Sequence, residues 1–147
     1  MSVSTTSRLA GSLLGVPVGF HGDRLGRAVD VLVDVHRWRV LGFVVERDDG
    51  GERFLPLAAS QAGPDEIEVG SPLMLLDNVD FYRARTRSLR SIAGAEIAYA
   101  GRHAGLLGDL VLSGSGEVGE LELDVEGDRR RVPAYGSRIP PSTATAA

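Results

Sequence analysis

The chain contains one sequence pattern twice, and this repeat constrains its fold more than any other feature. A shift of 79 residues places Gly22 on Gly101 and Asp30 on Asp109. The shift falls to 78 at Val40 and to 77 at Pro56, and both steps occur where the sequence predicts a hairpin turn. Duplication of one unit followed by loop trimming would leave such steps. Further matching pairs are Ser12 and Ser91, Gly15 and Gly94, Gly26 and Gly105, Phe43 and Leu121, and Val45 and Leu123.

Alternation of apolar and polar residues predicts that each unit is built from β-strands. In 29–35 the valines occupy every second position, with Asp30 and Asp34 between them. In 121–126 apolar and acidic residues alternate in the same way. This period of two is typical of a strand with one buried face. The predicted strands are 16–20, 26–35, 40–47, 53–57 and 66–69 in the first unit, and 95–99, 105–112, 117–125 and 129–134 in the second.

These strands divide the chain into two small units. We expect unit 1 at 12–70, unit 2 at 91–139 and a connector at 71–90 that is extended or briefly helical. Disordered tails are expected at 1–11 and 140–147, because their small polar residues cannot bury enough area to offset chain entropy. Each unit alone would be only marginally stable. The two units are therefore expected to pack together, or the chain to form a homodimer.

Composition removes several classes of function. All 16 basic residues are arginine and the chain has no cysteine, so it lacks lysine nucleophiles, thiolate metal sites and disulfides. The run 22–35 resembles a phosphate-binding loop, but no lysine follows its glycines and the next predicted element is a strand rather than a helix. No targeting segment or membrane span is apparent, so we expect a cytoplasmic protein without a cofactor.

The run from Ser12 to Leu57 resembles a PRC-barrel domain. The matching features are "LLGVPV", "GDRLGRAVDVLVD", the hairpin into "VLGFVV" and the strand ending "FLPL"; "SIAGAEIAYAGRHAGLLGDLVL" through "RRRVPA" is a weaker second match. The resemblance implies an all-β protein of two tandem small barrels, used mainly for contacts with other proteins. The family has no catalytic residues that could be transferred to this chain.

The first candidate partner site is the predicted hairpin tip "VHRWRV". It holds Trp38 between Arg37 and Arg39, with Val40 next, whereas unit 2 has "SGSGEV" at this place. Exposed tryptophan and arginine often dominate binding energy. The alternative is a structural role in which Trp38 folds across its own barrel or caps the neighbouring one.

The connector carries a basic stripe of Arg83, Arg85, Arg87 and Arg90. With Asp77 and Asp80 it has a net charge of +2, between flanks of −3 each. The stripe could bind RNA or a ribosome, but the overall charge of −4 opposes that attraction. The favoured interpretation is that the arginines are solvated or are tied internally to the acidic face of Glu120, Glu122 and Asp124. Phe81 and Tyr82 are interpreted as packing anchors.

The outer face of unit 1 is apolar where that of unit 2 is acidic. Gly42 and Val44 stand where Glu120 and Glu122 stand in unit 2, and Val40 is assigned to the same face. Such a face in a small barrel needs a cover. We expect the connector segment 72–77 or the second barrel to provide it, with a second copy of the chain as the other option.

Nothing in the sequence predicts a metal or catalytic site. His21, His36 and His103 fall on predicted turns without the spacing of metal ligands. The favoured function is therefore a non-enzymatic protein-interaction module, with an unknown protein partner, that acts as an adaptor or assembly factor in the bacterial cytoplasm. The alternatives are an RNA- or ribosome-associated factor that uses the connector, and small-ligand binding between the barrels.

Overall fold

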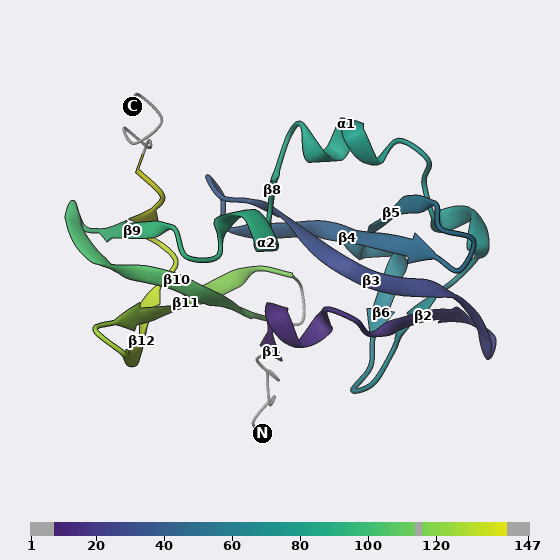
Figure 1. Cartoon of the computed structure of the whole chain (residues 1–147), viewed down its shortest axis with the longest axis horizontal. Helices are drawn as coiled ribbons and strands as arrows, with labels where there is room; N and C mark the ends of the chain where they lie inside the picture. The colour runs from purple at the N-terminus through teal and green to yellow at the C-terminus, as the bar shows by residue number, and fades with distance from the viewer. Residues whose placement is uncertain (1–7, 114–115, 141–147) are drawn as a thin grey trace, which may run out of the picture.

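The computed structural model describes residues 8–113 and 116–140 and shows a mainly β protein. Strands make up 56% of the described residues, and they form two sheets, one of which curls into a half-barrel. Figure 1 shows the sheets side by side along the longest axis of the molecule, one for each sequence unit. None of the described helices is long and apolar enough to cross a membrane.

The unit 1 sheet has the strand order β5-β4-β3-β2-β7-β6, with β8 paired to β3. The β2–β5 strands are antiparallel neighbours, as expected for consecutive hairpins, while β7 runs parallel to β2. The sequence did not predict β6, which is three residues long and has no apolar alternation. The strands are β2 (Pro17–Phe20), β3 (Asp23–Asp34), β4 (Arg39–Arg47), β5 (Glu52–Pro56), β6 (Ser60–Ala62), β7 (Ile67–Val69) and β8 (Arg87–Ser88).

The unit 2 sheet has the order β12-β11-β10-β9-β13, with β1 paired to β10. Its strands are β1 (Arg8–Leu9), β9 (Glu96–Tyr99), β10 (Arg102–Leu112), β11 (Val118–Val125), β12 (Asp128–Pro133) and β13 (Ser137–Arg138). In both sheets the four strands predicted from the repeat are present. Beyond these four strands the two sheets differ. The strand beside β9 is the antiparallel β13, whereas the strand beside β2 is the parallel β7.

The glycines of the first hairpin turn adopt the same backbone geometry in both units. His21 and Gly22 turn β2 into β3 with φ of 50° and 85°, and Ala100 and Gly101 turn β9 into β10 with φ of 52° and 81°. Positive φ at both central residues is typical of the type I′ hairpin turn, which favours glycine. A Cβ atom on Gly26 would overlap the carbonyl oxygen of Glu46. The repeated glycines therefore serve the fold rather than a ligand loop.

The short strand that precedes each unit pairs with the sheet of the other unit. The strand β1, which precedes unit 1, pairs Arg8 with Leu112 and Leu9 with Val111 in the unit 2 sheet. The strand β8, which precedes unit 2, pairs Arg87 with Val33 and Ser88 with Leu32 in the unit 1 sheet. These are the same positions one repeat apart, so the exchange is reciprocal. Figure 1 shows β1 beside β10, and α2 (Leu89–Ile92) lies against β3.

The exchange gives the two sheets one shared hydrophobic core. A single buried cluster contains Val33, Phe43 and Leu55 from unit 1 together with Leu110 and Leu121 from unit 2. The expectation that the two units pack together is thus confirmed. A second, smaller cluster of Leu32, Val44, Phe54 and Val79 lies between the unit 1 sheet and the connector.

One predicted boundary differs from the structure. The predicted N-terminal tail is too long, because Arg8–Leu9 forms β1 and Ala10–Leu13 forms the 3-10 helix η1, in which Ala10 is fully buried. The connector is briefly helical, as expected: it contains the 3-10 helix η3 (Pro72–Met74), the helix α1 (Val79–Arg83), β8 and the start of α2. Another 3-10 helix, η2 (Leu57–Ala59), leads into β6. Residues 1–7 and 141–147 of the expected tails lie outside the described residues.

Candidate functional site

Trp38 joins the two units and is not an exposed anchor. Its side chain is 5% exposed, and its indole Nε1 donates a hydrogen bond of 2.8 Å to the carbonyl oxygen of Ser137. The backbone closes the same joint, because Val118 N donates to Trp38 O and Val40 N donates to Gly116 O, both at 2.9 Å. The exposed interpretation of Trp38 is therefore wrong, and the alternative that it caps the neighbouring unit is confirmed.

The two arginines beside Trp38 remain on the surface, where they meet residues of unit 2. Arg37 and Arg39 are exposed, and the backbone of Arg39 forms an isolated antiparallel β-bridge with that of Glu117. Together with His36 and Tyr135 they line a hollow of about 410 Å³ whose floor includes Trp38. Tyr135 is 93% exposed. We refer to His36, Arg37, Arg39, Glu117 and Tyr135 as the junction surface.

Tyr135 was missed because its position depends on the packing of the two units. It follows β12 in the turn "PAYGSR", which by sequence is an ordinary strand end. Only the reciprocal exchange brings this turn against the tip of the β3–β4 hairpin. The one available signal was a large aromatic residue in a polar turn, a position where nothing in its own unit covers it.

The apolar outer face of unit 1 is covered by the connector, as expected. Val44 is fully buried beneath Phe54, and the Tyr82 ring stacks on the Phe54 ring at 3.9 Å between centroids. Phe54 and Leu76 also exchange two backbone hydrogen bonds of 2.8 Å. The role of Tyr82 as a packing anchor is thus confirmed, and Val44 is not accessible to a partner.

Val40 does not lie on this outer face. The β3–β4 register shifts between Leu32 and Val33, so that Gly42 pairs with Leu32 and Val40 with Val33. This irregularity turns Val40 into the shared core, where it is 1% exposed. The assignment of Val40 to the face of Val44 is wrong, because a β-bulge adds a residue that the simple period of two does not count.

The connector arginines contact unit 1 and the connector itself, and not the acidic face of unit 2. Arg83 donates to Glu52 at 2.8 Å, and this hydrogen bond raises the pKa of Arg83. Arg85 lies 3.6 Å from the centre of the Phe81 ring, which is 46% exposed. Arg90 Nε donates to the carbonyl oxygen of Val29 at 2.7 Å. The fourth member, Arg87, is exposed and pairs with Val33 only through its backbone in β8.

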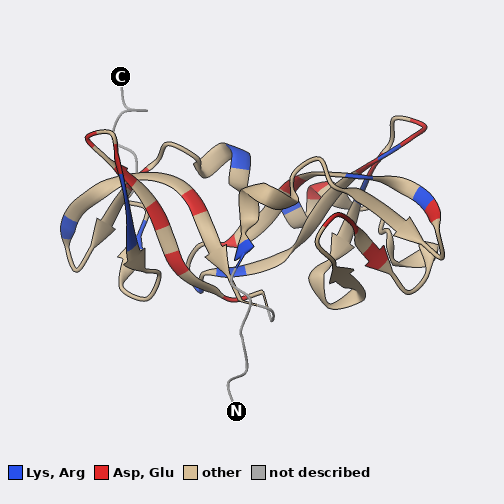
Figure 2. Cartoon of the chain, turned by 90° about the horizontal axis from the view of Figure 1, so that it is seen from below, with Lys and Arg blue, Asp and Glu red and all other residues tan. Residues whose placement is uncertain are grey.

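The acidic face of unit 2 is matched instead by its own neighbouring strand. Glu122 lies 3.5 Å from Arg129 and 3.4 Å from Arg131, and Glu120 lies 3.9 Å from Arg131. Figure 2 shows acidic residues following one another along the strands of this sheet. The expected tie between the connector and the acidic face is therefore wrong. The arginines Arg129 and Arg131 of the adjacent strand β12 pair with this face instead.

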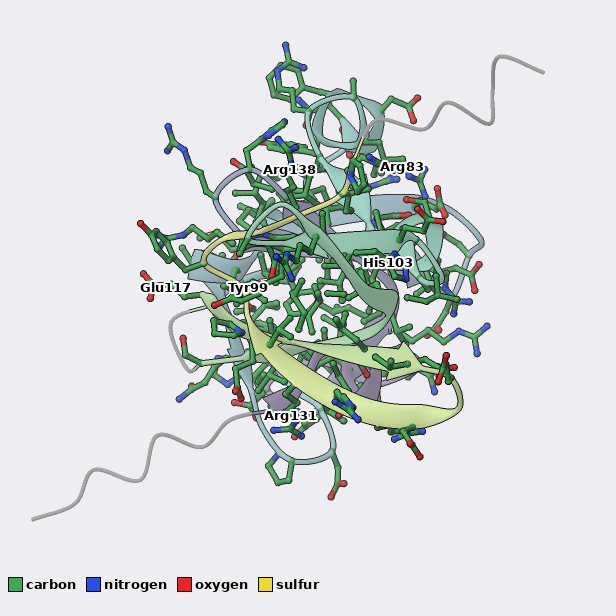
Figure 3. All side chains as sticks on the ribbon, turned by 90° about the vertical axis from the view of Figure 1, so that its left-hand side faces the viewer. Arg83, Tyr99, His103, Glu117, Arg131 and Arg138 are labelled. Atoms are coloured by element: carbon green, nitrogen blue, oxygen red, sulfur yellow. The ribbon has the colours of Figure 1, made fainter. Side chains whose placement is uncertain are left out.

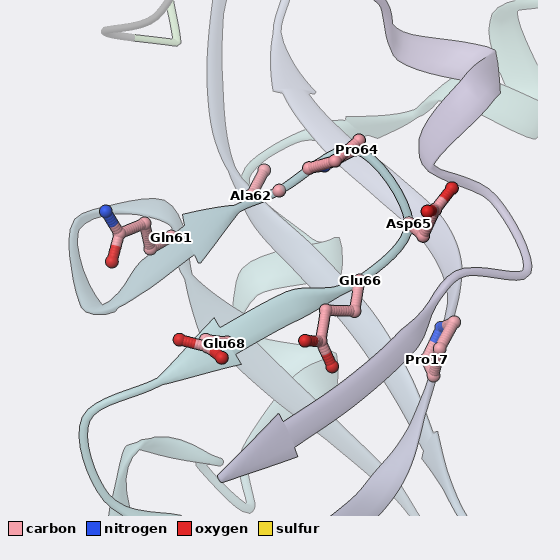
Figure 4. A pocket seen from close by; sticks show the side chains of 8 residues that line it. Pro17, Gln61, Ala62, Pro64, Asp65, Glu66 and Glu68 are labelled. Carbon is pink, nitrogen blue, oxygen red and sulfur yellow. The ribbon is translucent and has the colours of Figure 1, made fainter. Parts of the chain in front are cut away.

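The histidines and carboxylates do not form a metal site in the described part of the chain. No group of three or more His, Asp or Glu side chains there could hold a metal ion. Figure 3 shows His103 and Glu117 on opposite sides of the unit 2 end. An acidic groove near β6 and β7 contains Asp65, Glu66 and Glu68, whose side chains spread along it in Figure 4.

Among the described residues, one carboxylate has a clearly lowered pKa, and it stabilises a turn. The Gly51 backbone N–H donates to Asp49 at 3.0 Å and holds the pKa of Asp49 below its ordinary value. Asp49 lies in the exposed β4–β5 turn, away from each hollow described above.

A search against protein-family models and a search of curated proteins find no match to this chain.

Proposed function

We propose that the chain is a tandem PRC-barrel-like protein and a non-enzymatic protein-interaction module that binds its partner at the junction surface. The sequence features quoted above support the family, and the half-barrel sheet and the repeated β2–β5 and β9–β12 hairpins are compatible with it. The observation that carries the function is Tyr135, 93% exposed beside Arg37 and Arg39. Tyrosine and arginine are the surface residues most enriched in binding hot spots.

The joint beneath the junction surface makes it suited to binding. Trp38 is fixed by its hydrogen bond to Ser137 and by the backbone pairing on either side. The backbone that carries the flanking arginines is therefore held in place. A pre-organised surface loses less conformational entropy when a partner binds. Arg37 and Arg39 also give a local positive charge to a protein of net charge −4, with Glu117 as the opposing carboxylate. We therefore expect a partner with an acidic contact region.

The test compares two charge-reversal variants in affinity purification from the native organism. One variant carries Arg37→Glu, Arg39→Glu and Tyr135→Ala, and the control carries Arg102→Glu and Arg130→Glu, two exposed arginines outside the junction surface. The protein retained by the control and lost by the first variant is purified, and its Kd is measured by calorimetry. We expect at least about a ten-fold weaker Kd for the first variant.

Two outcomes contradict the proposal. Equal retention of every captured protein by both variants removes the junction surface as the binding site. Recovery of RNA or ribosomal proteins that depends on Arg83 and Arg87 instead favours the RNA-associated alternative, with salt-dependent binding as its signature.

A further inference from the structure

A second and larger hollow lies beside the joint between the units, next to Gly116. Its volume is about 680 Å³, within the range of ligand-binding clefts. Its walls come from η1, from the segment β6 and the loop after it, and from the end of β10. Leu57 provides apolar surface, the nearly buried Leu13 and Leu112 lie behind it, and Ala62 lies at the exposed rim. We refer to it as the η1–β6 hollow.

The η1–β6 hollow corresponds, one repeat away, to the place that Trp38 fills. In the registers of the repeat, Gly116 corresponds to Trp38 and Ser60 to Ser137, the residue that accepts the indole hydrogen bond. Three apolar walls of the hollow correspond to residues of the buried cluster that contains Trp38. These pairs are Leu13 and Ile92, Phe43 and Leu121, and Leu112 and Val33.

The described residues fill only part of the space that an indole at position 116 would take. A Cβ atom on Gly116 would overlap Leu57 Cδ2, so Leu57 reaches toward the path that the Trp38 side chain takes in the other unit. The residue that corresponds to Leu57 is Ala134, which is small and buried in the Trp38 cluster. The pair Trp38 with Ala134 is thus replaced by Gly116 with Leu57. Leucine is smaller than an indole, and the open volume of the hollow remains.

The rim of the η1–β6 hollow is suited to an extended peptide. The strand β6 ends its sheet, so its second edge has no partner among the described strands. Such an edge offers backbone donors and acceptors to an added strand, with alternate side chains directed into pockets. The adjoining loop is held in place, because Arg8 donates to the carbonyl oxygens of Gly63 and Pro64.

We propose that the η1–β6 hollow binds an extended segment of a protein partner that inserts a tryptophan side chain. The chain itself supplies the template, since Trp38 at the tip of a hairpin fills the corresponding place in unit 2. The site is separate from the junction surface. It rests on the proposed function only in that the ligand is a protein segment, and its test uses other residues, so each proposal can fail alone.

The test is a titration of the full, ¹⁵N-labelled chain followed by NMR. The probe is the acetylated and amidated peptide TVWVT, and the comparison peptide is TVAVT. We expect TVWVT to shift the amide signals of Ala62, Gly63 and Leu112 and to bind at least about ten-fold more tightly than TVAVT. The single indole signal of the protein, from Trp38, should stay in place because its own site is already filled.

Two variants test the template directly. The double variant Leu57→Ala with Gly116→Trp copies the Trp38 and Ala134 pair; the positive φ of Gly116, 86°, is also adopted by Trp38, at 51°. We expect it to fold, to show a second indole signal and to lose TVWVT binding. If it does not fold, Ala62→Arg should block binding at the rim, with Ala58→Arg as control, an exposed alanine outside the hollow.

Four results overturn the proposal. Equal binding of TVAVT, or shifts confined to the junction surface, removes the tryptophan site. Equal affinity for N-acetyltryptophanamide shows a site for small aromatic molecules rather than a peptide. Binding of TVWVT only after deletion of residues 1–7 shows that the hollow serves the chain's own N-terminal segment.

Discussion

The carboxylate of Asp109 accepts a hydrogen bond from the backbone N–H of Gly11, with 2.8 Å between the nitrogen and Oδ1. One repeat earlier, Asp30 accepts from the backbone N–H of Arg90 at 3.2 Å. Gly11 and Arg90 each lie in the short helix that leads a unit. Each aspartate therefore fixes the leading helix of the other unit, and this relationship is conserved between the two copies of the repeat.

Replacement of Asp30 by alanine is expected to destabilise the whole chain. Asp30 is 8% exposed and also accepts from the N–H of Val31, so its loss leaves buried donors without their acceptor. A lost buried acceptor costs about 1–3 kcal/mol of unfolding free energy. Urea denaturation followed by circular dichroism measures this, with Asp65→Ala in an exposed loop as control. Equal midpoints for the two variants would contradict the assigned role.

Replacement of Trp38 by alanine is expected to weaken the joint between the units. Loss of a buried aromatic side chain costs about 3–5 kcal/mol. Trp38→Phe keeps most of the packing and removes the hydrogen bond to Ser137, so it should cost only about 1 kcal/mol. Denaturation curves of both variants measure the two contributions. A loss below about 1 kcal/mol for Trp38→Ala would show that the joint does not depend on the indole.

Replacement of Gly42 by alanine is expected to disturb the cover of unit 1. An added Cβ atom would overlap the carbonyl oxygen of Leu55 and lie 2.7 Å from Phe54 Cζ. Forcing extra atoms into a packed site costs about 1–3 kcal/mol. Gly119→Ala is the matched control, because no described atom lies within 4 Å of its added Cβ. Thermal unfolding of both variants checks the difference, and equal melting temperatures would refute it.

The reciprocal exchange predicts that two fragments of the chain assemble with each other. Residues 1–84 keep β1 and η1, and residues 85–147 keep β8 and α2, which pair with the opposite sheets. Each fragment alone leaves its part of the shared core exposed. We expect a 1:1 complex on co-expression, measured by size exclusion with light scattering. Folded monomers of each separate fragment would show that the exchange is not needed.

Much of the strand pattern was predictable because it depends on neighbouring residues. Apolar and polar alternation marked β3, β4, β10 and β11, and the repeated glycines marked the hairpin turns. The short strand β6 and the positions of the helices in the connector were not predicted, because segments of two to five residues carry too little periodicity. The bulge that moves Val40 into the core is also invisible to a fixed period of two.

The candidate site was predictable only in part. Arg37 and Arg39 were predicted as exposed tip residues, whereas the sequence left open whether Trp38 is exposed or caps the neighbouring unit, and the structure shows it buried. The Trp38 side chain is buried by Ser137 and other residues of unit 2, which are distant from Trp38 in the sequence. Tyr135 was missed for the same reason, since its neighbours at the junction surface come from unit 1.

The sequence by itself determined the duplicated β-unit, because a period of two and glycine turns act over a few residues. Only the tertiary structure decided how the copies combine. The pairing of β1 with β10 and of β8 with β3, the burial of Trp38 and the open η1–β6 hollow depend on contacts between distant segments. Such contacts follow from how two packed units fill their shared core, and local residue preferences do not specify them.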